Sequence, residues 1–277
     1  MVRRVPLVYA CVAPHGGEII PAMAGRQREL FAPTTRGMRK VAKLMREARP
    51  DTIVVATPHN LRLRKHIGVV VSENTTGELR EGGSTVKLSA KCDVELGDAV
   101  LRRAESLGLP VVGANYGALE GELSDVAMDW GTLVPLWFML RGNSGCKVLI
   151  VTPSRGIPLK KNFDFGEVIA GEAEKSKKRV ALVASADQAH AHRKDGPYGF
   201  SPRAREYDAQ VQDAVRRNRL SDLMKLDEDL VEAAKPDSLW QLSILAGAVS
   251  QVQLRGELVS YQVPTYYGML CATFVRT

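Results

Sequence analysis

Residues 35–60 read TRGMRKVAKLMREARPDTIVVATPHN and contain one complete step of the fold. The first part predicts a helix over 35–48, because its apolar residues recur at the spacing of one helix face. Pro50 separates this helix from the β-branched run 52–56, which predicts a buried strand. A helix that leads through a proline into a buried strand is typical of α/β proteins.

The same alternation continues on both sides of this step. Residues 6–13 predict another buried strand. A further strand is predicted at 67–72, followed by a Gly- and Glu-rich connection, and residues 114–129 are predicted to be loop. No linker or repeat divides the chain, so we expect one α/β domain over residues 1–277. Further strands are predicted at 110–113, 147–152, 180–185, 258–263 and 269–275, and a further helix at 94–107.

Composition limits the class of protein. The 277 residues are 45% hydrophobic and 25% charged, as in ordinary globular proteins, and the apolar runs are shorter than the roughly 20 residues that cross a bilayer. We expect no membrane partner, and a cytoplasmic location because the first residues do not resemble a secretory signal. The 38 Lys and Arg exceed the 31 Asp and Glu, but both signs are interleaved, so we expect no nucleic-acid partner.

Two histidines occur in matching contexts. His15 and His59 each come directly after a proline that follows a predicted strand. The carboxyl ends of parallel strands meet at one edge of an open α/β sheet, and ligands bind at that edge. Two imidazoles in matched positions therefore make a metal site or a catalytic pair a specific hypothesis, beside the alternative of two hydrogen-bonded loop residues.

His190 is a third candidate, because it also lies just beyond a predicted strand. Asp187 comes shortly before it and is expected to orient an imidazole, since a carboxylate bonded to one ring nitrogen raises the basicity of the other. The remaining histidines, His66 and His192, lie among charged residues and are expected on the surface.

A metal site needs a ligand besides two histidines. Two histidines and one carboxylate form a facial triad that leaves open positions on Fe(II) for substrate and O₂. Residue types alone do not choose among five candidate carboxylates, which are Glu18, Glu120, Glu122, Glu232 and Asp237.

Five segments carry a further signal, and they are PHGG (14–17), TPHN (57–60), DWGTLVPL (129–136), SADQAH (185–190) and VPTYYG (263–268). In this order and at these separations they resemble the class III (LigB-type) extradiol ring-cleavage dioxygenases over nearly the whole chain. The resemblance implies a LigB-like single doubly wound mixed sheet flanked by helices. It also implies a non-haem Fe(II) enzyme that uses O₂ to open a catechol-like or ortho-aminophenol ring in the extradiol position.

The resemblance also implies roles for individual residues. His15 and His59 match the two metal-binding histidines, and His190 matches the catalytic acid–base histidine. The family's metal carboxylate is a glutamate that precedes a Gly-Ala pair on a late helix, and the same count here gives Asp237, with Glu232 as the second choice. The implied metal is Fe(II), with Mn and Zn as alternatives.

The sequence departs from the family at Trp130. Many members carry histidine at this position, whereas tryptophan offers one N–H donor and cannot exchange protons near neutral pH. We expect Trp130 either to contact the substrate, by stacking or a hydrogen bond, or simply to fill the core. Tyr116 and Asp187 are the other expected substrate-binding residues.

Two other functions stay open at this point. A Zn²⁺-dependent hydrolase would use the same ligands to activate water, with His190 as general base. A non-catalytic, Memo-like binding protein would be favoured if Asp237 turned away from the histidines. Members of the superfamily work as homodimers or with a second small subunit. We therefore expect a homo-oligomer, with a small second subunit as the alternative, acting on a small aromatic diol or aminophenol and O₂.

Overall fold

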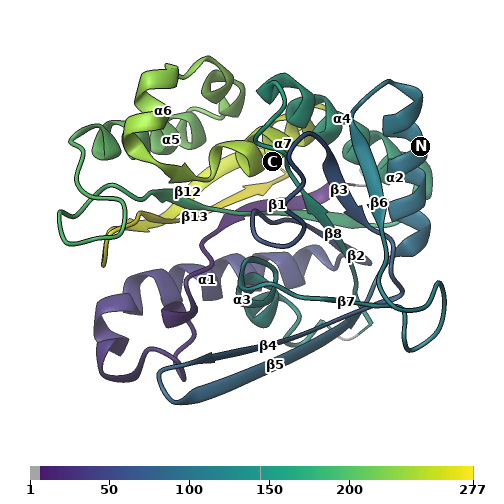
Figure 1. Cartoon of the computed structure of the whole chain (residues 1–277), viewed down its shortest axis with the longest axis horizontal. Coiled ribbons are helices and arrows are strands. Elements are labelled where there is room, and N and C mark those ends of the chain that lie inside the picture. Colours follow the sequence, from purple (N-terminus) through teal and green to yellow (C-terminus); the bar gives the residue numbers. More distant parts are fainter. Residues whose placement is uncertain (1–6, 144, 277) are drawn as a thin grey trace.

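A ten-stranded mixed sheet runs through the centre of the molecule (Figure 1). The computed structural model describes residues 7–143 and 145–276. The strands of this sheet are β1 (Leu7–Ala13), β2 (Thr52–Ala56), β3 (Ile67–Val70), β6 (Val111–Ala114), β8 (Lys147–Thr152), β9 (Val180–Ser185), β10 (Asp187–Ala189), β11 (Pro236–Asp237), β12 (Arg255–Gln262) and β13 (Met269–Val275). Hydrogen-bonded neighbours follow the order β11-β10-β13-β1-β9-β2-β8-β3-β6, and β12 pairs with β13.

Helices cover both faces of this sheet. They are α1 (Arg28–Ala48), α2 (Val94–Ser106), α3 (Trp130–Met139), α4 (Leu159–Ser176), α5 (Arg203–Arg216), α6 (Glu228–Ala234) and α7 (Leu239–Ser250), with short 3-10 helices η1 (Gly17–Ile19), η2 (Gly25–Gln27) and η3 (Leu220–Lys225). On β2, Val54 and Ala56 join the core under α2, α4 and α7, while Ile53 and Val55 join the core under α1 and α3. Burial on both faces explains why the central strands are mostly apolar. The predicted mixed sheet flanked by helices is confirmed.

Strand direction decides which loops can meet. Strands β1, β9, β2 and β8 are parallel neighbours, so their carboxyl ends lie at one edge of the sheet. Strand β3 pairs antiparallel with β8, and β6 runs parallel to β3. The loops that follow β3 and β6 therefore begin at the opposite edge.

A three-stranded sheet replaces the Gly- and Glu-rich connection that the sequence analysis predicted. Strands β4 (Asn74–Glu81) and β5 (Ser84–Lys91) form a hairpin, and β7 (Asp125–Ala127) pairs in parallel with β4. In Figure 1 the hairpin lies below α1 and α3. Its turn is formed by Gly82 and Gly83, whose φ angles of 56° and 76° are the left-handed values that a two-residue hairpin turn requires. The Gly-Gly pair was the signal for this hairpin.

Helix α1 begins at Arg28, earlier than the predicted start at residue 35. Pro33 lies inside the helix, where a proline removes one backbone hydrogen bond. Both Pro33 and Glu29 are exposed, so water can solvate the carbonyl group that loses its partner. Within the described ranges, no helix combines the length and the apolar character needed to cross a bilayer.

Candidate metal centre and its cavity

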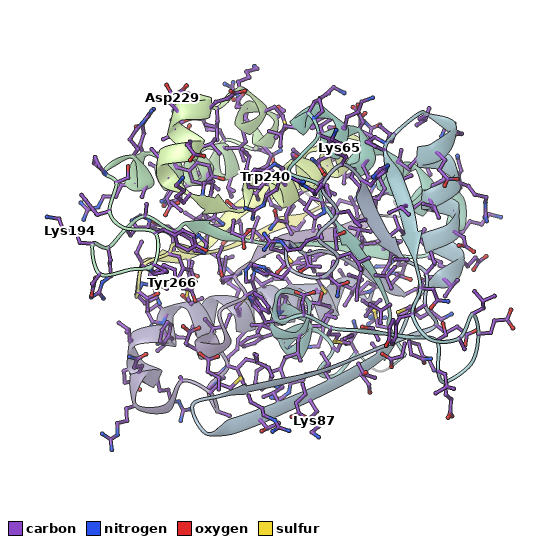
Figure 2. All side chains as sticks on the ribbon, in the orientation of Figure 1. Lys65, Lys87, Lys194, Asp229, Trp240 and Tyr266 are labelled. Carbon is purple, nitrogen blue, oxygen red and sulfur yellow. The ribbon has the colours of Figure 1, made fainter. Side chains whose placement is uncertain are left out.

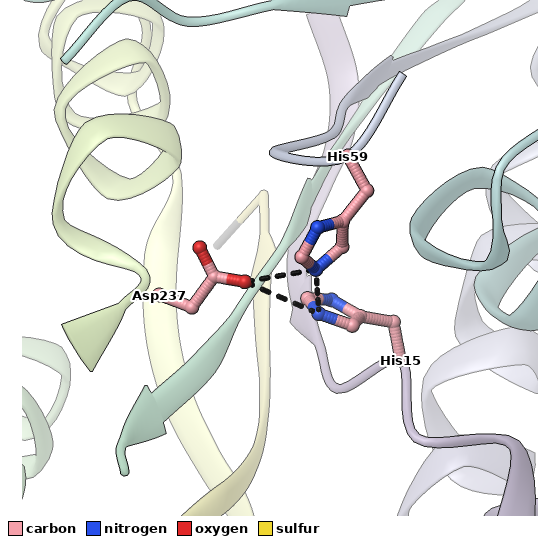
Figure 3. Close-up of side chains that lie close together, drawn as sticks. All are labelled: His15, His59 and Asp237. Carbon is pink, nitrogen blue, oxygen red and sulfur yellow. Dashed lines mark hydrogen bonds and ion pairs between the residues drawn. The ribbon is translucent and has the colours of Figure 1, made fainter. Parts of the chain in front are cut away.

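Three ligand-type side chains converge at the carboxyl edge of the central strands (Figure 3). His15 follows β1 and His59 follows β2, and β9 is the only strand between these two in the sheet order. Asp237 ends β11 and pairs with Asp187 of β10, which directly follows β9. One ligand atom from each of His15, His59 and Asp237 lies within 4.8 Å of the other two.

The spacing of these atoms suits a shared metal ion. Oδ2 of Asp237 is 2.9 Å from Nε2 of His59 and 3.6 Å from Nε2 of His15, and the two Nε2 atoms are 3.1 Å apart. Two imidazole nitrogens that bind one ion at about 2.1 Å, at roughly a right angle, would be about 3.0 Å apart. Two nitrogens and one carboxylate oxygen form a donor set that suits Fe(II) or Zn²⁺. Both the donor set and the spacing therefore fit a divalent metal.

A hydrogen-bond chain fixes the ring of His15. The hydroxyl of Ser185 donates to the carbonyl oxygen of Gly131, so its oxygen accepts from Nδ1 of His15 at 3.0 Å. Nδ1 therefore carries a proton, and Nε2 is the ring nitrogen that faces Asp237 and His59. Metal-binding histidines in proteins are commonly oriented by such a bond to the second ring nitrogen.

Arg155 and Gln241 hold Asp237 in place. The guanidinium of Arg155 donates to Oδ1, which leaves Oδ2 directed toward the two histidines. Gln241 donates to the backbone oxygens of Asp237 and Ser185, at 2.9 and 3.0 Å. Burial opposes ionisation of Asp237, but the hydrogen bonds from the histidines and the charge of Arg155 hold its pKa well below the ordinary value.

Asp187 lies against His15. Its Oδ1 accepts from the backbone N–H of His15 at 3.1 Å, and its Oδ2 is 3.2 Å from Nε2 of the same ring. Burial raises the pKa of Asp187, although the charges of His15 and His190 oppose this. For His15, burial disfavours the charged ring, but Asp187 and Asp237 outweigh it and raise the pKa. The same two carboxyl groups favour a bound cation at this position.

His190 lies on another wall of the cavity with a free ring nitrogen. Its Nδ1 donates to the carbonyl oxygen of Gln188 at 2.8 Å, so Nε2 carries the lone pair. The ring stacks on Tyr267, with centroids 5.2 Å apart, and meets the edge of Tyr198 at 5.4 Å. Burial lowers the pKa of His190 below the ordinary 6.5, although Asp187 and Asp237 oppose this. A neutral imidazole in this tautomer can accept a proton through Nε2.

One cavity of about 770 Å³ opens to solvent and is lined by His15, His59, Arg155, Asp187, His190 and Asp237. Trp130 lines it, is 47% exposed, and stacks on His59 with ring centroids 4.2 Å apart. The alternative that Trp130 only fills the core is therefore wrong. Its indole instead forms the wall behind one of the two histidines.

The structure does not bring Tyr116 to this cavity. Tyr116 is 75% exposed and follows β6, the edge strand that runs opposite to β1 and β2. The expectation that it binds substrate beside His15 and His59 is corrected by this strand direction, which the sequence did not reveal.

The other four candidate carboxylates take different positions. Glu18 lines the cavity and accepts from the hydroxyl of Tyr267 at 3.3 Å. Glu232 also lines it, but its side chain is 80% exposed and pairs with Lys235. Glu120 and Glu122 are exposed on the loop after β6.

His192 contradicts its predicted surface position, whereas His66 is exposed as expected. The side chain of His192 is 5% exposed, and its Nε2 bonds to Asp208 at 2.8 Å. Asp208 also accepts from Tyr261 at 2.6 Å and from the backbone of Ala189. Asp208 lies on α5, far from His192 in the sequence, so the charged residues next to His192 gave the wrong expectation.

The sequence did not single out Arg155 or the neighbouring Trp240, whose ring centroid lies 4.3 Å from the Arg155 guanidinium carbon. A signal for Arg155 was present. It follows β8 through Pro153, so it repeats the pattern of strand and then proline that pointed to His15 and His59.

Comparisons with known proteins give one family and a shared fold. A family model described as the catalytic LigB subunit of aromatic ring-opening dioxygenase matches residues 9–271. The curated protein CA_C1420 of Clostridium acetobutylicum is 23% identical over 250 residues, which are 90% of this chain and 53% of that protein. The chain thus spans about half the length of this relative.

Among solved structures, the uncharacterized protein JW3007 of Escherichia coli K12 matches with a TM-score of 0.58 and 17% identity. The match covers 96% of this chain and 99% of that chain. At this identity the likeness concerns the fold alone.

Proposed function

The chain belongs to the family of the catalytic LigB subunit of aromatic ring-opening dioxygenases, and on this premise we propose that it is a non-haem Fe(II) extradiol dioxygenase. The substrate class is a catechol-like diol or an ortho-aminophenol. The ring opens next to its hydroxyl groups, and both atoms of O₂ enter the product.

The observation that carries this proposal is the convergence of His15, His59 and Asp237 on one point in the wall of a cavity. Two histidines and one carboxylate would leave further positions on Fe(II) open. When bound, Fe(II) supplies positive charge that acidifies a hydroxyl group and positions that hold the diol and O₂ side by side.

The residues around the metal position have separate tasks in this proposal. His190 takes a proton from a substrate hydroxyl through Nε2 and returns it later, which suits a neutral imidazole. Tyr267 and the carbonyl oxygen of Gln188 hold that ring in orientation. Trp130 offers an aromatic face beside His59, against which a substrate ring can pack.

A Zn²⁺-dependent hydrolase is the second candidate, because two histidines and a carboxylate are also a common catalytic zinc set. In that reaction Nε2 of His190 would take a proton from water. The Memo-like binding protein has less support, since Oδ2 of Asp237 faces both histidines rather than turning away. We retain a homo-oligomer, with a small second subunit as the alternative, as part of the proposal.

The decisive experiment is anaerobic loading with Fe(II), metal analysis, and a panel of catechols and aminophenols scored for O₂ uptake and ring-opened product. We expect one iron per chain and product that depends on O₂. The His59→Ala variant should lose the bound iron and the O₂-dependent product. His66→Ala is the matched control, because it changes an exposed histidine, and it should keep the iron and the product. Retention of zinc, together with hydrolysis and no O₂ uptake, would contradict the proposal and favour the hydrolase.

A further inference from the structure

Two chemically different sets of side chains line the cavity. One set is the histidines and carboxylates described above. The other set, which we call the apolar arm, consists of Ile157, Leu159, Met224, Leu226, Val231 and Trp240. All six are half-buried, so part of each side chain faces the cavity while another part packs on the core.

The apolar arm is assembled from distant parts of the chain. Ile157 and Leu159 come from the connection into α4, Met224 and Leu226 from η3 and its end, Val231 from α6 and Trp240 from α7. Trp240 lies toward the middle of the molecule in Figure 2. Half-exposed apolar side chains gathered from separate elements in one concave site are typical of a small-molecule pocket.

Arg155 connects the apolar arm to the metal position. Its guanidinium donates to Asp237 and lies over the ring of Trp240 at 4.3 Å. Trp240 is therefore one side chain away from the carboxylate that faces the histidines. A ligand whose head lies at the metal position can reach the arm without leaving the cavity.

The size of the cavity exceeds the needs of a single ring. Its volume of about 770 Å³ is in the range of about 300–1,000 Å³ that drug-sized ligands occupy. Besides Glu18, Arg155, Asp187 and Asp237, the charged side chains at the same cavity are Arg62, Lys235, Glu228 and Glu232, which are exposed and of both signs. These charges do not favour an acidic substituent on the substrate ring. The apolar arm favours a hydrophobic substituent.

We propose that the substrate is an amphipathic aromatic diol, with its hydroxyl groups at the metal position and a bulky apolar substituent, an alkyl chain or a second ring, in the apolar arm. This inference rests on the proposed function, because the metal position is what holds the diol. Burial of one methylene group contributes about 0.8 kcal/mol, which is about fourfold in affinity.

The test compares the affinities of catechol and 4-butylcatechol for the Zn²⁺-loaded full chain by calorimetry, since Zn²⁺ has no redox chemistry and the ligand stays intact. We expect 4-butylcatechol to bind at least about tenfold more tightly than catechol, allowing for incomplete burial of four methylene-sized groups. Leu226→Asp should remove most of this gain and leave the affinity for catechol unchanged. Val231→Thr, a milder change of nearly the same shape, should reduce the gain several-fold.

Leu123→Asp is the matched control, because Leu123 is 77% exposed and does not line the cavity. It should leave both affinities unchanged. If catechol binds but 4-butylcatechol binds no more tightly, the inference is overturned and the proposed function stands. If neither ligand binds in a metal-dependent way, the proposed function falls and this inference falls with it.

Discussion

Arg155 donates to Oδ1 of Asp237 and thereby leaves Oδ2 as the oxygen that faces His15 and His59. From the resemblance we expected a glutamate as the metal carboxylate, whereas Asp237 is an aspartate at the end of the two-residue strand β11. Its short side chain reaches the histidines because β11 pairs with β10, directly beside the ends of the central strands. Arg155 then decides which oxygen points to the metal position.

Replacing Arg155 with methionine should weaken metal binding without abolishing it. The variant keeps much of the packing on Trp240 but releases Oδ1, so the carboxylate loses its fixed orientation. Loss of such an outer partner typically costs about 10–100-fold in metal affinity. Competition with a chelator measures this. Arg141→Met is the control, because Arg141 lies over Trp137 in the same manner, at 3.9 Å, but outside the cavity. Equal affinities in both variants would refute the positioning role.

Replacing either metal-site histidine should abolish metal retention. In His15→Ala or His59→Ala, one of three protein ligands is lost and the remaining pair leaves an incomplete site. Metal content after gel filtration measures this, with His66→Ala as the exposed control. A His15→Ala protein that keeps stoichiometric metal would show that His15 is not a ligand.

His190→Ala should bind metal and substrate but turn over about 10²–10⁴-fold more slowly, which is the usual range for loss of general acid–base catalysis. His190 is outside the group of three ligand-type residues, so metal content should stay at the wild-type level. Single-turnover rates, measured together with substrate affinity, separate the two effects. Unchanged turnover would remove His190 from the mechanism.

The pH dependence of the reaction should reflect the lowered pKa of His190. Burial is the main cause of this shift and outweighs the opposing charges of Asp187 and Asp237. The neutral ring is the proton acceptor, so kcat/KM should stay level as the pH falls through the ordinary value of 6.5 and decline only below it. A pH profile of kcat/KM measures this. A decline centred above pH 6.5 would contradict the assignment.

Asp93→Ala should destabilise the fold by about 2–4 kcal/mol, because it removes a helix cap and leaves buried partners unpaired. Asp93 is fully buried, caps α2 by accepting from the N–H of Leu96, and also accepts from Thr52 and from Lys178. Urea unfolding measures this loss. Asp227→Ala removes the exposed cap of α6 and should lower the free energy of unfolding by a smaller amount. Equal losses would contradict this ranking.

The same carboxylate should make stability depend on pH. Burial opposes its ionisation, but the hydrogen bonds from Lys178, Thr52 and Leu96 hold the pKa of Asp93 below its ordinary value. The stabilisation is therefore present above the unfolded-state pKa and is lost as the pH falls through the lower, folded-state value. In Asp93→Ala this part of the acid dependence should disappear.

Local patterns predicted the parts of the fold that depend on local physics. The apolar runs of β2 and β13 predicted buried strands, because burial on both faces favours apolar residues at successive positions. The β4–β5 hairpin was missed although its Gly82-Gly83 turn was visible in the sequence. The predicted surface position of His192 was wrong, because its hydrogen-bond partner Asp208 comes from another element.

By itself the sequence determined the α/β alternation and the two histidines that follow a strand and a proline, because hydrophobic periodicity and the restricted backbone of proline act between near neighbours. Residue types alone did not decide which of five carboxylates is the metal ligand. The sequence also did not reveal that β6 runs in the direction opposite to β1. The tertiary structure decided that Asp237 faces the histidines, that Arg155 orients it, that Tyr116 lies elsewhere and that an apolar arm adjoins the site. Each of these facts depends on strand order and direction, which bring together residues far apart in the chain.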